Sequence, residues 1–277
     1  MISVFQGGLG FIEGPAWTRS GHLVVASISK GCVFQLDGSG RVVARHETGG
    51  GPNGLACSAA GLYVAQNGGI FGASGSTPGG VQRIAGNQVE LLFAEGATAP
   101  NDLCFGPDGR LYVSDPLTDK ALTEPVEGRV LACDLHTGAW EVAVASRLFP
   151  NGVAFDASGQ RFYLALTYLR AIERFGFHAG TLTSEGTLCE TVNGRPDGMA
   201  VDLEGKLWVC TPGTGGIEVF TAEGRFVKRI EIGEGSMTTN CCFGGADMRD
   251  LFITASARGQ VLTMRVDVPG LPLYPFR

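Results

Sequence analysis

The feature that most constrains the fold of this chain is an internal repeat that recurs every 40 to 50 residues. Each copy begins with a polar residue and a short apolar run, continues through a Gly- or Asp-containing turn, and ends in a stronger apolar run. The six copies begin at Glu13, Asn53, Asn101, Asn151, Asp197 and Thr239. Repeats of this length are typical of chains built from one supersecondary unit that stacks on its neighbours.

Within each copy, apolar and polar residues alternate as they do in β-strands. The first copy contains HLVVAS, GCVFQLD and RVVARHE, which are separated by ISK and GSG, and no copy contains a convincing amphipathic helix. Four short strands in about 45 residues form one blade of a propeller. The sequence therefore predicts an all-β protein, a six-bladed β-propeller with four-stranded blades, as a single domain over residues 1–277. The last copy lacks a strand, and residues 2–6 are expected to supply it.

The repeat starts are expected to meet in space, because the first strand of each propeller blade lines the central channel. Pro-Asn-Gly and Pro-Asp-Gly are ordinary turn sequences, so most of these starts have a simple structural explanation. Glu13 does not, because glutamate is a poor turn former. Two carboxylates, Glu13 and Asp197, would repel each other at the axis unless a cation lay between them. The amide of Asn151 would add a neutral oxygen ligand, and such an oxygen set favours Ca, Mg or Mn.

Composition excludes several other functions. The formal net charge is -6, and no basic stripe is available to meet phosphates, which argues against a nucleic-acid partner. No apolar run approaches the roughly 20 residues of a membrane helix, and the start MISVFQGGLGF does not resemble a signal peptide. The eight cysteines lie in apolar, strand-like runs and form no C-x-x-C motif. We expect reduced, buried thiols and a cytoplasmic protein.

The motifs EGPAW, APND, FPNGVAFD, RPDGMAVD and TNCCFGG, in this order and spacing, resemble the gluconolactonase, senescence-marker-protein and luciferin-regenerating-enzyme family. The resemblance covers essentially the whole chain and implies a six-bladed propeller with one divalent metal at the top of the channel. It implies that Glu13, Asn151 and Asp197 are metal ligands, that Asp197 is also the general base, and that Asn101 contacts substrate or a metal-bound water. Calcium is our first choice of ion, with Mg, Mn, Zn and Fe left open because the metal varies between family members.

One departure from the family pattern concerns the substrate. Sugar-lactonase members often carry an arginine two residues before the Asn of the PND motif, where this chain has Ala99. A clamp for a substrate hydroxyl is therefore missing at that position, which puts an aldonolactone in doubt. An aromatic or aliphatic lactone and an organophosphate stay open beside a sugar lactone.

Two loops that follow second strands are expected to overhang the axial ring, at 67–80 in the second blade and at 115–128 in the third. Long loops on a rigid scaffold commonly determine specificity. Asn67, Asp115 and Tyr168 are therefore predicted to contact substrate, although polar groups that only cap a loop would explain each of them equally well. Asn53 has no assigned role.

These observations predict a metal-dependent hydrolase that acts on a small lactone or related ester. The cation would polarise the carbonyl, and Asp197 would move the proton. None of the four histidines falls near a repeat start, and no G-x-S-x-G motif occurs, so a serine triad is poorly supported. The alternative is a non-catalytic propeller that serves as a binding platform; a lyase, an isomerase and a strictosidine-synthase-like scaffold are further possibilities.

Overall fold

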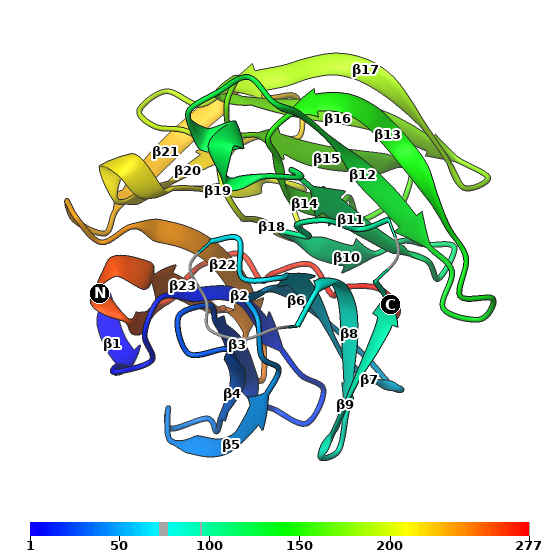
Figure 1. Cartoon of the computed structure of the whole chain (residues 1–277). Helices are drawn as coiled ribbons and strands as arrows, with labels where there is room; N and C mark the ends of the chain where they lie inside the picture. Colours follow the sequence, from blue (N-terminus) through cyan, green and yellow to red (C-terminus); the bar gives the residue numbers. More distant parts are fainter. Residues whose placement is uncertain (72–76, 95, 277) are drawn as a thin grey trace.

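The computed structural model describes residues 1–71, 77–94 and 96–276, and it contains six antiparallel four-stranded sheets arranged around a central channel (Figure 1). The predicted fold class, an all-β six-bladed propeller with four-stranded blades, is therefore confirmed. Part of the loop predicted at 67–80, residues 72–76, lies outside the described residues.

The first three blades follow one another along the chain, each running from the channel outward. Blade 1 consists of β2 (Ile12–Trp17), β3 (Leu23–Ser27), β4 (Cys32–Leu36) and β5 (Val42–Glu47). Blade 2 consists of β6 (Pro52–Ser58), β7 (Gly61–Asn67), β8 (Gly79–Ala85) and β9 (Gln88–Phe93). Blade 3 consists of β10 (Leu103–Phe105), β11 (Leu111–Asp115), β12 (Glu127–Cys133) and β13 (Trp140–Leu148).

The last three blades complete the ring. Blade 4 consists of β14 (Pro150–Phe155), β15 (Arg161–Leu166), β16 (Ala171–His178) and β17 (Thr181–Glu190). Blade 5 consists of β18 (Met199–Val201), β19 (Leu207–Thr211), β20 (Gly216–Phe220) and β21 (Phe226–Glu231). Blade 6 consists of β22 (Thr238–Gly244), β23 (Asp250–Ala255), β24 (Gln260–Arg265) and β1 (Ser3–Gln6), so that both ends of the chain share one sheet. The helical segments described are the short 3-10 turns η1 (Asp119–Leu122), η2 (Pro212–Thr214) and η3 (Ser256–Arg258).

Tight turns and inter-blade packing follow from the residue types of the repeat. In the turn of blade 5, the Asp202 carboxylate accepts hydrogen bonds from the backbone N–H groups of Glu204 and Lys206 and from the indole of Trp208. Gly205 adopts the left-handed φ of 77° that this turn requires. The buried apolar side chains of the described residues form six clusters, one between each pair of neighbouring blades.

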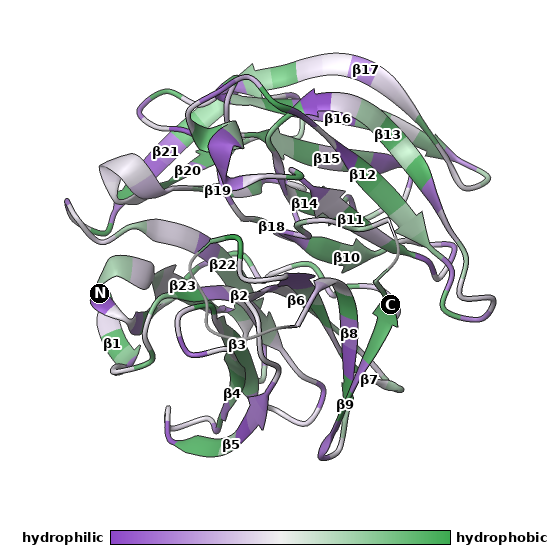
Figure 2. Cartoon of the chain, in the orientation of Figure 1, coloured by the Kyte–Doolittle hydropathy of each residue, from purple (hydrophilic) through white to green (hydrophobic). Residues whose placement is uncertain are grey.

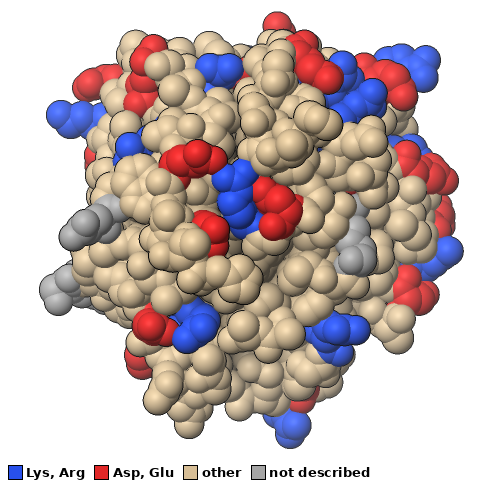
Figure 3. All heavy atoms as spheres, turned by 90° about the vertical axis from the view of Figure 1, so that its right-hand side faces the viewer, with Lys and Arg blue, Asp and Glu red and all other residues tan. Residues whose placement is uncertain are grey.

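The inner and outer strands of the blades differ in hydropathy. In Figure 2 the strands β3 and β4 are largely hydrophobic, whereas the outer strands β5 and β21 carry hydrophilic stretches. On the face shown in Figure 3, Lys and Arg side chains lie beside Asp and Glu side chains.

All eight cysteines are free, which agrees with the prediction of reduced thiols. In the described part of the chain, no helix is long and apolar enough to cross a membrane.

The C-terminal tail crosses the channel after blade 6 is complete. Backbone hydrogen bonds join Gly270 to Met248 in blade 6 and Leu271 to Val201 in blade 5. Further along, Tyr274 packs against Phe155, with ring centroids 6.5 Å apart. The tail, the red segment that runs across the middle of the ring in Figure 1, therefore covers one end of the channel.

Candidate functional site

The six repeat starts take equivalent places at the inner strands. Glu13, Asn53, Asn151 and Thr239 lie in the first strands of their blades, and Asn101 and Asp197 lie two residues before theirs. Five of the six are buried, and Asp197 is half-buried. Backbone hydrogen bonds link neighbouring starts, from Gly54 N–H to the Asn101 carbonyl and from Gly198 N–H to the Thr239 carbonyl, each 2.8 Å long.

Glu13 is a carboxylate held near the axis in an apolar environment. Its side chain is 6% exposed, and one carboxylate oxygen accepts the N–H of Gly14 at 2.9 Å. Burial raises the pKa of Glu13 to about 7; the negative charge of Asp102 adds to the rise, while hydrogen bonding to Gly14, Thr239 and Asn240 opposes it. Among the described residues, no cationic side chain is one of the groups that set this pKa.

Asp197 is the second predicted ligand, and the structure brings it near Glu13. Burial raises the pKa of Asp197 well above its usual value, and repulsion by Glu13 raises it further. The amide of Asn151 and the N–H of Gly198 stabilise the Asp197 carboxylate and partly offset these effects. The mutual repulsion of Glu13 and Asp197 requires that their charges lie close together in space, as the repeat predicts.

The third predicted ligand, Asn151, has its amide orientation set by two neighbours. Its Nδ2 donates to the Thr167 hydroxyl at 3.1 Å, and that hydroxyl donates its single hydrogen to the Pro196 carbonyl at 2.7 Å. Because a carbonyl can only accept, the Thr167 oxygen must accept from the Asn151 NH₂ group. Asn151 Oδ1 is then left available as an acceptor or a ligand.

A third buried carboxylate, Asp102, was missed by the sequence analysis, which assigned a role only to the preceding Asn101. Asp102 accepts backbone N–H groups from Leu103 at 2.9 Å and from Val153 at 3.2 Å. Burial raises its pKa to about 7, and the charge of Asp102 in turn contributes to the raised pKa values of Glu13 and Asp197. A signal in the sequence marks this residue, because the residue that follows the repeat start is glycine in four copies but Asp102 in the third.

The glycines at that position make room for the side chains of the other two copies. A Cβ on Gly54 would lie 2.5 Å from an Asp102 oxygen, and a Cβ on Gly198 would lie 2.0 Å from the side chain of Asn240. Asp102 and Asn240 belong to blades 3 and 6, which stand opposite each other in the ring. Together they form a polar layer across the channel beneath the repeat starts.

The predicted substrate contacts fall into two groups. Asn101 is 8% exposed, and no described residue hydrogen bonds to its side-chain amide. Asn67 is fully buried: its Oδ1 accepts the Gly69 N–H at 2.8 Å, but its Nδ2 has no hydrogen-bond partner among the described residues. Both amides therefore have a hydrogen without a partner among the described residues, but that of Asn67 has no exposed surface.

Asp115 is placed differently. It has no exposed surface, and its two oxygens accept the backbone N–H groups of Thr98 and Ala99 at 3.2 and 2.8 Å. Arg129 forms an ion pair with it at 3.0 Å. We therefore interpret Asp115 as a residue that fixes the segment leading to Asn101, and its direct contact with substrate stays a prediction.

Tyr168 lies in the turn between β15 and β16 and is half-buried. The guanidinium of Arg195, which the sequence analysis did not consider, lies 5.6 Å from the centre of its ring. Arg195 also donates to the Leu122 carbonyl at 2.8 Å. Arg195, two residues before Asp197, thus joins the 115–128 loop of blade 3 to Tyr168 of blade 4. No sequence pattern indicated this contact, because it depends on how loops from three blades meet.

The sequence of residues 11–257 matches the family described as SMP-30/Gluconolactonase/LRE-like region. The chain belongs to this family.

Three relatives match different shares of this chain in sequence. The gluconolactonase of Zymomonas mobilis is 25% identical over 288 residues, which cover 92% of this chain and 79% of that protein. Pentonolactonase XacC of Haloferax volcanii is 26% identical, and the match covers 59% of this chain but only 55% of that protein. The regucalcin of Gallus gallus is 33% identical over 46% of this chain and 48% of its own length.

Solved structures show the same fold at low identity. A gluconolactonase from Xanthomonas campestris superposes with a TM-score of 0.79 at 24% identity, covering 97% of this chain and 89% of that one. A protein from Agrobacterium tumefaciens described as a calcium-binding protein, regucalcin, has a TM-score of 0.79 at 22% identity, covering 98% and 96%.

Whether the SMP-30-like site suits a cation can be judged from its donor atoms. Within the described ranges, no three His, Cys, Asp or Glu side chains are placed to hold a metal ion. The predicted ligand set is of another kind, since it combines two carboxylates with the free amide oxygen of Asn151. Carboxylate and amide oxygens are the ligands that hard divalent cations bind, and a divalent charge balances two carboxylates.

Proposed function

We propose that this protein is a divalent-metal-dependent hydrolase of a lactone or related cyclic ester. The observation that carries the proposal is the pair Glu13 and Asp197, two repelling carboxylates beside the free oxygen of Asn151. Membership of a family that includes proteins named gluconolactonase and pentonolactonase supports the choice of reaction.

Glu13, Asp197 and Asn151 would hold the ion, and calcium is our first choice, because their oxygens suit a hard cation and a structural neighbour is described as calcium-binding. When bound, a divalent cation supplies positive charge that polarises an ester carbonyl. Thr167, through its hydrogen bonds to Asn151 and to Pro196, would keep the Asn151 oxygen available to the ion.

Asp197 is the proposed general base and acid. It is the most exposed of the six repeat starts, so its carboxylate is reachable by water and substrate. With the ion in place, the Asp197 carboxylate would accept a proton from the attacking water. Asp197 then returns this proton to the alkoxide oxygen that leaves when the ring C–O bond breaks.

The remaining predicted residues orient the substrate. Asn101 would donate an amide hydrogen to a substrate oxygen or a water, and Asp115 fixes the segment before Asn101. A substrate contact of the fully buried Asn67 stays a prediction. Tyr168 and Arg195, together with the 115–128 loop that Arg195 contacts, would form the rim of the site and supply a cation that Ala99 does not. We propose that this rim favours lactones that carry hydroxyl or carboxylate groups. A cytoplasmic location stays a prediction.

The test is lactonase activity of protein stripped with EDTA and reloaded with Ca²⁺, Mg²⁺, Mn²⁺ or Zn²⁺. Glucono-δ-lactone, γ-valerolactone and dihydrocoumarin serve as substrates, and acid release is followed with a pH indicator. We expect activity to disappear on stripping and to return with one of the ions. Asp197→Asn at saturating metal should lower kcat by about 10²–10⁴-fold, whereas Asp134→Asn in an exposed turn should leave it unchanged. Full activity in metal-free protein would refute the proposal, and metal binding without hydrolysis of any ester would favour the binding platform.

A further inference from the structure

The channel holds a second space, which we call the channel chamber, on the far side of the Asp102–Asn240 layer from the repeat starts. Its volume is about 960 Å³. The later residues of all six inner strands line it, together with the C-terminal tail from Leu271 to Phe276. Glu13, Asn101, Asn151 and Asp197 do not line the chamber, so it is distinct from the site described above.

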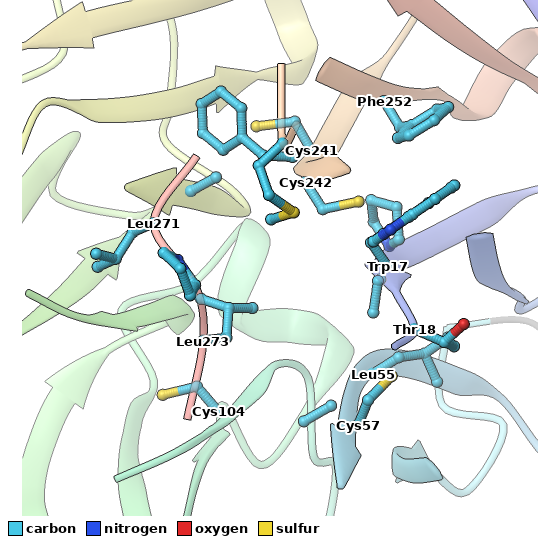
Figure 4. A pocket seen from close by; sticks show the side chains of 18 of the residues that line it. Trp17, Thr18, Leu55, Cys57, Cys104, Cys241, Cys242, Phe252, Leu271 and Leu273 are labelled. Carbon is cyan, nitrogen blue, oxygen red and sulfur yellow. The ribbon is translucent and has the colours of Figure 1, made fainter. Parts of the chain in front are cut away.

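Most of the chamber wall is apolar and rich in sulfur and aromatic groups. Its charged side chains are Asp102, Asp250 and Arg19, and the guanidinium of Arg19 lies 5.1 Å from the centre of the Phe276 ring. Figure 4 shows Trp17 and Phe252 on the right, the tail residues Leu271 and Leu273 on the left, and Cys57 and Cys104 below. The rings of Trp17 and Phe252 are stacked, with centroids 5.4 Å apart and planes 8° apart. A space of this size with such a lining resembles the pockets that bury small apolar ligands.

One charged group faces the chamber from its inner end. Asp102 lines the chamber and is 8% exposed, and backbone N–H groups of Leu103 and Val153 occupy one site on each of its oxygens. No Lys, Arg or His of the described residues forms an ion pair with Asp102. The other carboxylate on the lining, Asp250, is already paired with Arg265 at 2.9 Å. A carboxylate at the end of an apolar space requires a counter-charge or a strong hydrogen-bond donor.

We propose that the channel chamber binds a small apolar amine, whose ammonium group meets Asp102 and whose hydrocarbon or aromatic part packs against Trp17 and the tail. An amine satisfies both features of the chamber, because it carries one cationic donor group at the end of an apolar body. The aromatic side chains near that body also favour a cation over a neutral or anionic head. This site is additional to the proposed hydrolase site and does not depend on it.

The probe is 4-phenylbutylamine, which is protonated at pH 8, and the comparison compounds are 4-phenylbutan-1-ol and 4-phenylbutyrate. Calorimetric titration of the full chain should show one amine bound per protein, with the alcohol at least 10-fold weaker and the carboxylate undetectable. Asp102→Asn should weaken amine binding at least 10-fold and leave alcohol binding within 2-fold. Asp250→Asn is the matched control and should change neither.

A second variant locates the site without removing the charge. Cys57→Phe places a larger side chain in the chamber and should abolish amine binding while Asp102 is retained; its Tm shows whether it is folded. Equal binding of amine and alcohol would overturn the proposal, as would unchanged binding by Asp102→Asn or Cys57→Phe, or no binding at millimolar amine. If Asp102→Asn fails to fold, the three-compound series together with Cys57→Phe decides the question.

Discussion

The buried Glu13 should make the metal-free protein less stable as the pH rises. In the folded protein its pKa is about 7, whereas its usual value is 4.5. Between these two values the folded state holds a proton that the unfolded chain has released, so the free energy of unfolding falls as the pH increases. The stabilisation is fully present below about pH 4.5 and is lost by about pH 7.

The size of this effect follows from the interval between the two pKa values. At 1.36 kcal/mol for each pH unit, Glu13 alone accounts for about 3 kcal/mol. This is a large fraction of the 5–15 kcal/mol by which domains are typically stable. Asp102, with a pKa of about 7 instead of 3.8, acts in the same direction. A divalent cation bound to ionised Glu13 and Asp197 should reverse the trend, because it binds only the folded, deprotonated form.

The assay is urea unfolding of EDTA-treated protein, followed by tryptophan fluorescence, at pH values from 4.5 to 8. The wild type should lose about 3 kcal/mol more than Glu13→Gln over this range, since glutamine cannot titrate. Glu90→Gln removes an exposed carboxylate on the outer strand β9 and should follow the wild type. Equal pH dependence of wild type and Glu13→Gln would show that Glu13 is not a buried, unneutralised acid. If added calcium does not change the free energy of unfolding at pH 8, that result would argue against a calcium site at Glu13.

Three further outcomes follow from neighbouring contacts. Thr167→Val should weaken calcium binding by about 10- to 100-fold in calorimetry with little change in Tm, because the Asn151 amide loses the partner that orients it. Arg195→Ala should raise KM for a hydroxylated or acidic lactone more than for γ-valerolactone; an equal change for both would exclude a role in selectivity. Gly54→Ala should lower the free energy of unfolding by about 1–3 kcal/mol, measured in urea, because its Cβ would overlap Asp102.

The repeat carried most of the information about the fold because its period is that of one blade. Residues as far apart as Glu13 and Thr239 were expected to meet only because the blades close into a ring, and the structure brings the repeat starts together. The strand that completes blade 6, Ser3–Gln6, was expected because the last copy is one strand short. The positions of strands could be predicted because the same structural unit occurs six times, so that the strand pattern of one copy can be compared with that of the other five.

The contacts that fix individual side chains were not accessible in this way. The bond from Thr167 to Pro196 and the contact of Arg195 with Tyr168 depend on loops whose paths differ from blade to blade. Asp115 shows the same limitation: its position after a second strand was expected correctly, but its ion pair with Arg129 on the neighbouring strand was not foreseen. Aligning the repeats predicts where along the channel a residue lies. It does not predict the hydrogen-bond partners of that residue, because these lie in loops that differ between the copies.

Asp102 and Asn240 are the two positions at which the residue after the repeat start is not glycine. Four copies place glycine after the repeat start, and two opposite blades replace it with a polar side chain that fills the space over the neighbouring glycine. Asp102 and Asn240 both line the channel chamber, and the charge of Asp102 also raises the pKa values of Glu13 and Asp197 at the repeat starts. The carboxylate of Asp102 therefore acts on both parts of the channel. On our two proposals, the carboxylate of Asp102 lies between a divalent cation at one end of the channel and an apolar amine at the other.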